Sequence, residues 1–137
     1  MNFPDAELWR ARSRLLKRLR GFLEGRGYLE VDTPHLCGHA SLEPYLESYE
    51  VPVEEGVDYL ITSPEFWLKR ILGTGLDRIY EIAHTYRRAE RGPWHTREFL
   101  MLEWYAKDRT LEAMMDETEA LCREGLERDL VFQRIRV

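Results

Sequence analysis

Two long runs of β-forming residues, separated by a short charged loop, constrain the fold of this chain more than any other feature. The first run, DRIYEIAHTYR, covers residues 77–87 and is rich in β-branched and aromatic residues. The loop AERGPWHTRE contains a glycine and a proline, and the run FLMLEWYA follows it. We therefore predict a strand, a loop and a second strand that returns beside the first.

The returning strand has two different faces, because successive side chains of a strand point in opposite directions. Leu100, Leu102 and Trp104 share a uniformly apolar face, which we predict to be core. The other face carries Glu103 between aromatic residues. An unpaired buried carboxylate shifts its pKa or destabilises the fold. Glu103 is therefore predicted to have a cationic partner, from the protein or from a ligand.

The segment before this pair of strands begins with an amphipathic helix. Apolar residues recur at three-to-four-residue spacing from position 8 to position 22, and Asp5 is a candidate N-cap. Gly25 and Gly27 are predicted to end the helix, and YLEV over residues 28–31 reads as a short strand that stops before Pro34.

The remaining elements follow from turn and capping signals. LESYEVPVEEGVDYLIT predicts a β-hairpin with its second strand near residues 59–62. Ser63 and Pro64 open a helix over EFWLKRIL that ends at the glycines 73 and 75. Thr110 opens a last helix, and VFQRIRV at residues 131–137 reads as the beginning of another strand.

Composition bounds the class of protein. A chain of 137 residues that is 44% apolar can bury a core and fits one domain. Its net charge of −5 argues against a surface dominated by contacts with nucleic-acid phosphates. Cys37 and Cys122 are far apart and predict no disulfide framework, and no signal or membrane-spanning segment is found. We expect a cytoplasmic protein that does not enter a membrane.

Three ordered segments resemble motifs of a known family. GYLEVDTPHL resembles motif 1 of the class II aminoacyl-tRNA synthetases, with Pro34 at its characteristic proline, and YRRAERGPWHTREF with MLEWY resembles motif 2. TSPEFWLKRIL followed by HTREFLMLEWY is similar to the lysyl-tRNA synthetases, and most of all to their shortened relatives, the elongation factor P β-lysine ligases. The resemblance runs from about Trp9 to the end of the chain. It implies an α+β fold, an antiparallel sheet flanked by helices.

The resemblance implies activation of a lysine-like amino acid with ATP, which forms an aminoacyl adenylate and pyrophosphate. Arg87 matches the arginine that holds the α-phosphate, where a guanidinium fork suits the developing negative charge. His95 matches the loop histidine that helps to fold back the triphosphate, and Phe99 matches the aromatic residue that stacks on adenine. Glu90 is the candidate for the carboxylate that contacts the adenine amine.

The amino-acid pocket is implied in the same way. Glu65 of TSPE matches the carboxylate that takes the backbone-type amine of the substrate, and Ser63 belongs to the same segment. Glu103 and Tyr105 match the groups that take the side-chain ammonium, which accounts for a carboxylate on that face of the strand.

The chain departs from the family pattern at several positions. Thr96 and Arg97 replace the asparagine and proline of the usual His-Asn-Pro-Glu-Phe, and Ala89 replaces the glutamate of Arg-x-Glu, with Glu90 one position later. No motif 3, which carries a second ATP-binding arginine and acidic Mg²⁺ ligands, is found in the 137 residues. We therefore expect residues 1–137 to form the N-terminal half of one catalytic domain, without an anticodon-binding domain. Most ligands of the cofactor Mg²⁺ are then expected outside it.

Several alternatives stay open. Read alone, the charged residues after position 87 fit a solvated loop with weak ion pairs as well as a phosphate site. His35, Cys37 and His39 in HLCGH suggest zinc, but without a fourth ligand or a known spacing we predict no metal site there. The resemblance implies lysine or β-lysine as the substrate, and the acidic balance and the lack of an anticodon-binding domain favour elongation factor P over tRNA as the acceptor. A lysyl-tRNA synthetase-like catalytic fragment and a non-catalytic binding paralogue are the alternatives. The complete motif 1 implies a homodimer.

Overall fold

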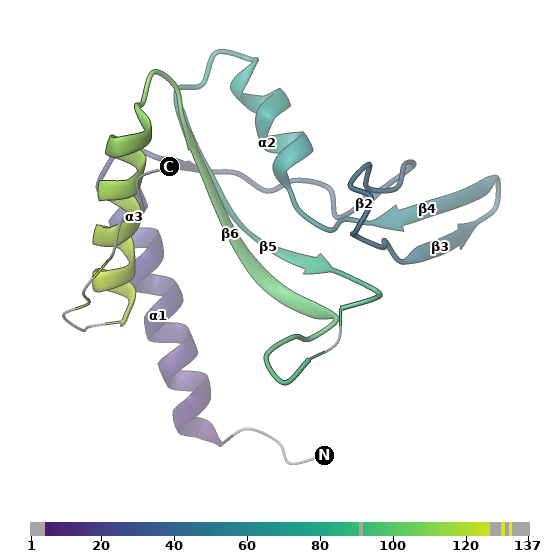
Figure 1. The fold of residues 1–137 in the computed structure, drawn as a ribbon, viewed down its shortest axis with the longest axis horizontal. Helices are drawn as coiled ribbons and strands as arrows, with labels where there is room; N and C mark the ends of the chain where they lie inside the picture. The colour runs from purple at the N-terminus through teal and green to yellow at the C-terminus, as the bar shows by residue number, and fades with distance from the viewer. Residues whose placement is uncertain (1–4, 91, 127–129, 131, 133–137) are drawn as a thin grey trace. The chain divides into compact units, whose positions relative to one another are not determined.

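The computed structural model describes residues 5–90, 92–126, 130 and 132, and Figure 1 shows their fold. The chain divides into two compact units. The first consists of residues 1–28 and 108–137, and the second of residues 29–107. The predicted strand at residues 131–137 lies almost wholly outside the described residues.

The first unit is built from the two helices α1 (Ala6–Glu24) and α3 (Leu111–Leu126), and both begin as predicted. The Asp5 side chain accepts a hydrogen bond from the Leu8 N–H at 2.9 Å, and the Thr110 hydroxyl accepts one from the Ala113 N–H at 3.2 Å. These caps satisfy N–H groups that have no partner inside a first turn.

The two helices pack closely at Gly125 of α3. A Cβ atom at this position would lie 3.2 Å from the Leu19 side chain and 3.4 Å from that of Leu15, both on α1. Near the end of α1, the Tyr28 hydroxyl donates a hydrogen bond to the buried carboxylate of Glu117 on α3. Arg26 Nε also lies 3.9 Å from Glu117 Oε1, so this buried carboxylate has a cationic neighbour as well as a hydrogen-bond donor.

The second unit contains two three-stranded sheets. In the first, the long strands β5 (Arg78–Tyr86) and β6 (Glu98–Ala106) pair antiparallel over their full length, which confirms the predicted strand, loop and returning strand. The short strand β1 (Leu29–Glu30) pairs with the other edge of β5. The α+β class is confirmed with one refinement, because β1 runs parallel to β5 and the sheet is mixed.

The second sheet has the order β2-β4-β3 and contains the predicted hairpin. It consists of β2 (Leu36–Cys37), β3 (Glu50–Val53) and β4 (Gly56–Leu60), with β3 and β4 antiparallel. β4 begins at Gly56 and ends at Leu60, whereas the sequence predicted a strand near residues 59–62. Ile61 and Thr62 therefore lead into the next helix. Helix α2 (Glu65–Leu72) follows, and the Ser63 hydroxyl accepts a hydrogen bond from the Glu65 N–H at 3.0 Å.

The buried residues described in the second unit come mainly from β5 and from the segment 61–64 that leads into α2. Ile79 and Tyr80 of β5 and Leu68 of α2 are fully buried. The apolar face of β6 is not buried to the same extent, which corrects the prediction that it is core: Leu100, Leu102 and Trp104 are half-buried. The reason is topological, since β6 is the edge strand of its sheet among the described residues. None of the described helices is both long and apolar enough to cross a membrane.

Candidate functional site

Arg87 lies directly after β5, at the base of the loop that connects β5 to β6. Its backbone N–H donates a hydrogen bond to the Arg97 carbonyl at 2.9 Å, which closes the loop. Its guanidinium donates from Nε to the Thr62 carbonyl at 3.3 Å and from Nη1 to Glu90 Oε1 at 2.9 Å. The guanidinium carbon also lies 5.2 Å from the centre of the Phe99 ring. The side chain is thus held in place on three sides, as a phosphate-binding arginine requires.

His95 and Glu90 join Arg87 within the same loop. His95 Nε2 lies 3.8 Å from Glu90 Oε2, and a single β-bridge links His95 to Gly92. A Cβ atom on Gly92 would lie 2.8 Å from His95 Nδ1, so a larger residue there would displace the His95 ring from its present position. The four residues predicted to bind ATP are therefore brought together. One carboxylate oxygen of Glu90 faces Arg87 and the other faces His95.

The departures from the family pattern leave the loop ordered by other contacts. The Thr96 hydroxyl donates to the Glu98 carbonyl at 2.6 Å, and Glu98 Oε1 lies 3.0 Å from His84 Nδ1. The loop base at Arg97 is fixed by the backbone hydrogen bond from Arg87. An asparagine and a proline are therefore not needed to close this loop.

Three of the residues predicted to bind the amino acid form a second cluster. The Ser63 hydroxyl donates to Glu103 Oε1 at 2.5 Å, and the Tyr105 hydroxyl donates to Glu103 Oε2 at 3.1 Å. Burial, followed by the neighbouring Glu103 carboxylate, raises the pKa of Tyr105 well above its ordinary value. The phenol therefore stays neutral and remains a donor at physiological pH.

Glu103 is half-buried and, among the residues that the structure describes, has these two hydroxyls as its hydrogen-bond partners and no cation at ion-pair distance. The described part of the protein therefore supplies no ion pair to Glu103, although its carboxylate is near enough to Lys69 to contribute a smaller share to the raised pKa of that ammonium. A carboxylate oriented by two neutral donors can still accept from an ammonium group, since each of its oxygens has two lone pairs.

Glu65 has a partner that the sequence interpretation missed. Its carboxylate contacts the Lys69 ammonium one helical turn later, and this hydrogen bond is the main cause of the raised pKa of Lys69. The Glu-to-Lys spacing of four residues was the available signal. A substrate amine at Glu65 would therefore share or displace a contact that the helix already makes.

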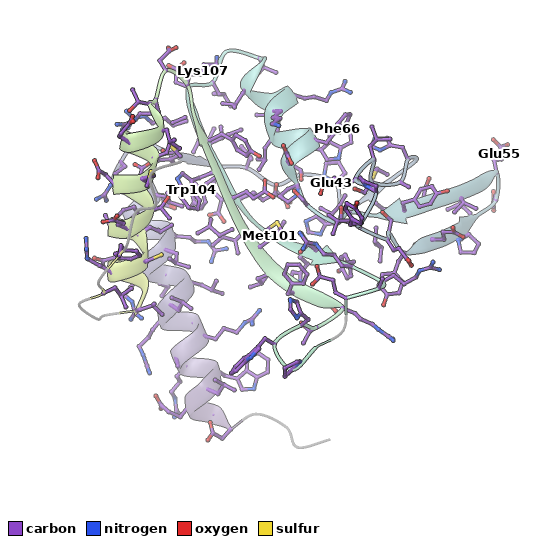
Figure 2. All side chains as sticks on the ribbon, in the orientation of Figure 1. Glu43, Glu55, Phe66, Met101, Trp104 and Lys107 are labelled. Carbon is purple, nitrogen blue, oxygen red and sulfur yellow. The ribbon has the colours of Figure 1, made fainter. Side chains whose placement is uncertain are left out.

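A cavity of about 570 Å³ opens beside the amino end of α2. Ser63, Glu65 and Lys69 line it from the helix side, and Cys37 at the end of β2 and His39 just after it line another side. Glu43 and Phe66, which also line it, are both labelled in Figure 2. Arg87, Glu103 and Tyr105 are not among the lining residues, so the cavity adjoins the predicted amino-acid group through Ser63. The segment 39–43 carried no sequence signal for this role.

Thr62 and Ser63 connect the two clusters through one peptide unit. The Thr62 carbonyl accepts from the Arg87 guanidinium, and the next residue donates its hydroxyl to Glu103. Thr62 is buried, and the backbone here leads directly into α2. The group around Arg87 and the group around Glu103 are thus held at a fixed separation.

The described residues do not form an Mg²⁺ site around Arg87. The neighbouring carboxylate, Glu90, faces Arg87 with one oxygen and His95 with the other. A magnesium ion requires nearly octahedral oxygen ligands and in nucleotide sites is usually held by one or two carboxylates together with the phosphates. Mg²⁺ therefore stays an expectation from the family resemblance.

Comparison with known proteins identifies the group to which this arrangement belongs. The family model of the tRNA synthetases class II (D, K and N) matches residues 5–132. The chain belongs to this family. As a class II synthetase relative it is related to ATP-using, aminoacyl-adenylate-forming ligases, and motifs 1 and 2 fall inside the matched range.

Individual relatives are of two kinds. The chain is 36% identical over 127 residues to the lysine–tRNA ligase of Magnetococcus marinus, which covers 90% of this chain and 25% of the relative. It is 35% identical over 130 residues to the elongation factor P–(R)-beta-lysine ligase of Edwardsiella ictaluri, which covers 90% of this chain and 40% of the relative. The chain thus spans between a quarter and two fifths of the length of these two relatives.

Proposed function

We propose that this class II chain is part of a ligase that activates lysine or β-lysine with ATP and transfers the acyl group to a lysine of elongation factor P. The observation that carries the proposal is the link through Thr62 and Ser63. It joins an arginine that its neighbours hold in place to a carboxylate that, among the described residues, has no cation at ion-pair distance. An enzyme that joins an ammonium-bearing amino acid to ATP needs both groups at a fixed separation.

In the first step the substrate carboxylate attacks the α-phosphorus of ATP, a P–O bond to the β-phosphate breaks, and pyrophosphate leaves with its electron pair. Arg87 would stabilise the charge that builds on the α-phosphate oxygens. Its Nε and Nη1 are engaged by Thr62 and Glu90, which leaves Nη2 as the group that faces no described partner and can donate to a phosphate oxygen. His95 would assist with the β- and γ-phosphates, and Phe99 would stack on adenine.

The amino acid would be held from its other end. Its side-chain ammonium would donate to Glu103, and Ser63 and Tyr105 would keep this carboxylate in one orientation. In the second step the amine of the acceptor attacks the carbonyl carbon of the adenylate, AMP leaves and the attacking nitrogen loses a proton. The product is an amide.

Glu90 is proposed to hold Arg87 in position. This role would accompany or replace the expected contact of Glu90 with adenine. Its Oε1 is bonded to the arginine at 2.9 Å, and the usual glutamate position of Arg-x-Glu is Ala89. The carboxylate therefore restrains the guanidinium that the α-phosphate needs.

Transfer to tRNA is the second candidate function. The similar identities of 36% and 35% to a lysine–tRNA ligase and an elongation factor P ligase favour neither acceptor. The net charge of −5 supports a protein acceptor, because RNA binding depends on neutralising phosphates with a basic surface.

Amino-acid-dependent exchange between ATP and pyrophosphate tests the first step, with α-lysine and both β-lysine enantiomers as substrates. Direct binding of each ligand is measured in parallel, so that slow turnover is distinguished from absent sites. Acyl transfer to elongation factor P and to tRNA is then compared. Binding of ATP without any lysine isomer would favour a non-catalytic nucleotide-binding paralogue and contradict the proposed substrate.

A further inference from the structure

The histidine-rich segment after Pro34 does not form the cluster that its sequence suggests. The Cys37 thiol contacts the His39 and Tyr59 carbonyls, and the His39 ring packs edge-on against Phe66 with 4.9 Å between ring centres. His35 instead turns towards Glu81 on β5, with 3.7 Å between Nε2 and Oε1. The residues of HLCGH therefore separate, and one of them joins a different group.

That group is a set of three metal-ligand types from separate parts of the chain. One ligand atom each of Asp32, His35 and Glu81 lie within 4.8 Å of one another, and it is the one such group found among the described residues. Asp32 and His35 flank Pro34, while Glu81 lies in the middle of β5. The pairing of β1 with β5 brings these segments together.

Glu81 is a carboxylate in the interior of the protein. It is 3% exposed and shares its strand face with the buried residues Ile79, Ala83 and Thr85. Its Oε1 accepts from the Thr33 N–H at 3.0 Å, and its Oε2 accepts from the Thr33 hydroxyl at 2.9 Å. These bonds fix the carboxylate but leave its negative charge uncompensated by either donor.

His35 supplies an independent observation. Its Nε2 is buried and has no hydrogen-bond partner among the residues that the structure describes. Its distance of 3.7 Å from Glu81 Oε1 is too long for a hydrogen bond. Two ligands of a tetrahedral zinc ion, each bonded at about 2.0–2.1 Å, lie roughly 3.4 Å apart, which is close to this separation. A buried imidazole nitrogen and a buried carboxylate thus face each other across a gap that suits an ion.

We propose that Asp32, His35 and Glu81 bind one first-row divalent transition metal ion, with zinc as the best match. An imidazole ligand favours zinc and its neighbours over magnesium and calcium, which prefer oxygen alone. Asp32 is exposed and closes the site from the solvent side after a change of side-chain rotamer, and water takes the fourth position. Thr33 orients Glu81 as an outer partner. The ion fastens the segment around Pro34 to β5, and this role does not depend on the proposed ligase activity.

The alternative is a protonated His35 that forms an ion pair with Glu81 without any metal. The metal site and the ion pair can be distinguished by metal titration. The ion pair requires no metal, whereas the metal site binds one ion per chain. The metal-free chain, prepared by dialysis against a chelator, is titrated with Zn²⁺ by calorimetry and with Co²⁺ by visible absorption. We expect one ion per chain, a Co²⁺ absorption band in the visible range and a higher melting temperature with Zn²⁺.

Variants test which side chains bind. His35→Asn and Asp32→Asn alter side chains that are half-buried and exposed, so both variants should fold. We expect His35→Asn to abolish stoichiometric binding, Asp32→Asn to weaken it, and Thr33→Val to lower the affinity about 10- to 100-fold. The matched controls are His39→Asn and Cys37→Ser, which alter the other candidate ligands of the same segment and should leave binding unchanged. Absence of stoichiometric binding, or a loss in the controls equal to that in His35→Asn, would overturn the proposal.

Discussion

The assignment of Glu103 to the substrate ammonium can be tested by replacing it with glutamine. The Glu103→Gln change removes the negative charge and keeps the size of the side chain. Glu103 accepts from the Ser63 hydroxyl at 2.5 Å and from the Tyr105 hydroxyl at 3.1 Å. A glutamine keeps one acceptor oxygen, and the hydroxyl that meets its amide can rotate to accept. The variant should therefore fold and keep most of its stability.

The expected loss of lysine affinity follows from the bond that disappears. A hydrogen bond to a charged group contributes about 1.5–3 kcal/mol, which corresponds to a roughly tenfold to 150-fold change in affinity. ATP should lose much less, because the nucleotide is assigned to Arg87 and its neighbours. Norleucine, which has a methyl group in place of the ammonium, should bind the variant and the original chain about equally.

Calorimetric titrations of lysine, β-lysine, norleucine and ATP measure these changes. Glu50→Gln is the matched control, since it makes the same change at an exposed carboxylate of β3 in the same unit. Equal losses for lysine and ATP, or an unchanged lysine affinity, would refute the assignment.

Three further predictions concern Arg87, Tyr105 and assembly. Arg87→Ala should lower ATP affinity roughly tenfold or more, but it should lower the free energy of unfolding by only about 1 kcal/mol. The control Arg88→Ala, at the exposed pair with Glu47, should not show this loss of ATP affinity. Urea unfolding and ATP titration of both variants measure these changes, and an Arg87→Ala variant that mainly unfolds would show that Arg87 is structural. The pKa of Tyr105 is raised in the folded state, so the contribution of this residue to stability is complete below the unfolded pKa of about 10 and is lost as pH rises towards the folded pKa. Between pH 9 and about 12, the free energy of unfolding should therefore decline less steeply for Tyr105→Phe than for the original chain. Identical slopes of this free energy against pH would contradict the prediction. The motif 1 region predicts a homodimer, which light scattering at micromolar concentration tests, with a stable monomer as the contrary result.

Local sequence signals were sufficient for most of the elements. The caps at Asp5 and Thr110 involve N–H groups three residues away, and the start of α2 depends on Ser63 and Pro64 beside it. Such contacts form within one turn of chain, so residue type and spacing determine them. The long strands β5 and β6 were equally clear, because their composition and the loop between them point to the same structure.

The candidate site was predictable from sequence only through motif resemblance, which named its residues but not their partners. Ser63 meets Glu103 across 40 positions, and Arg87 reaches the Thr62 carbonyl across 25. The Glu65 and Lys69 contact was within reach of the helical spacing rule, whereas the wall of the cavity around His39 was not. Contacts at long sequence separation depend on how the elements pack, and no local pattern encodes that.

The sequence by itself determined where the helices and the two long strands lie, and that β6 carries a carboxylate in need of a partner, but it did not reveal β2 or the end of β4. Only the tertiary structure decided that β1 pairs parallel with β5, that β6 is the edge strand among the described residues and has a half-buried apolar face, and that His35 faces Glu81. The physical reason is that periodicity reports which face of an element is apolar. What covers that face, and which side chains then meet, is set by the pairing register and the packing of distant segments.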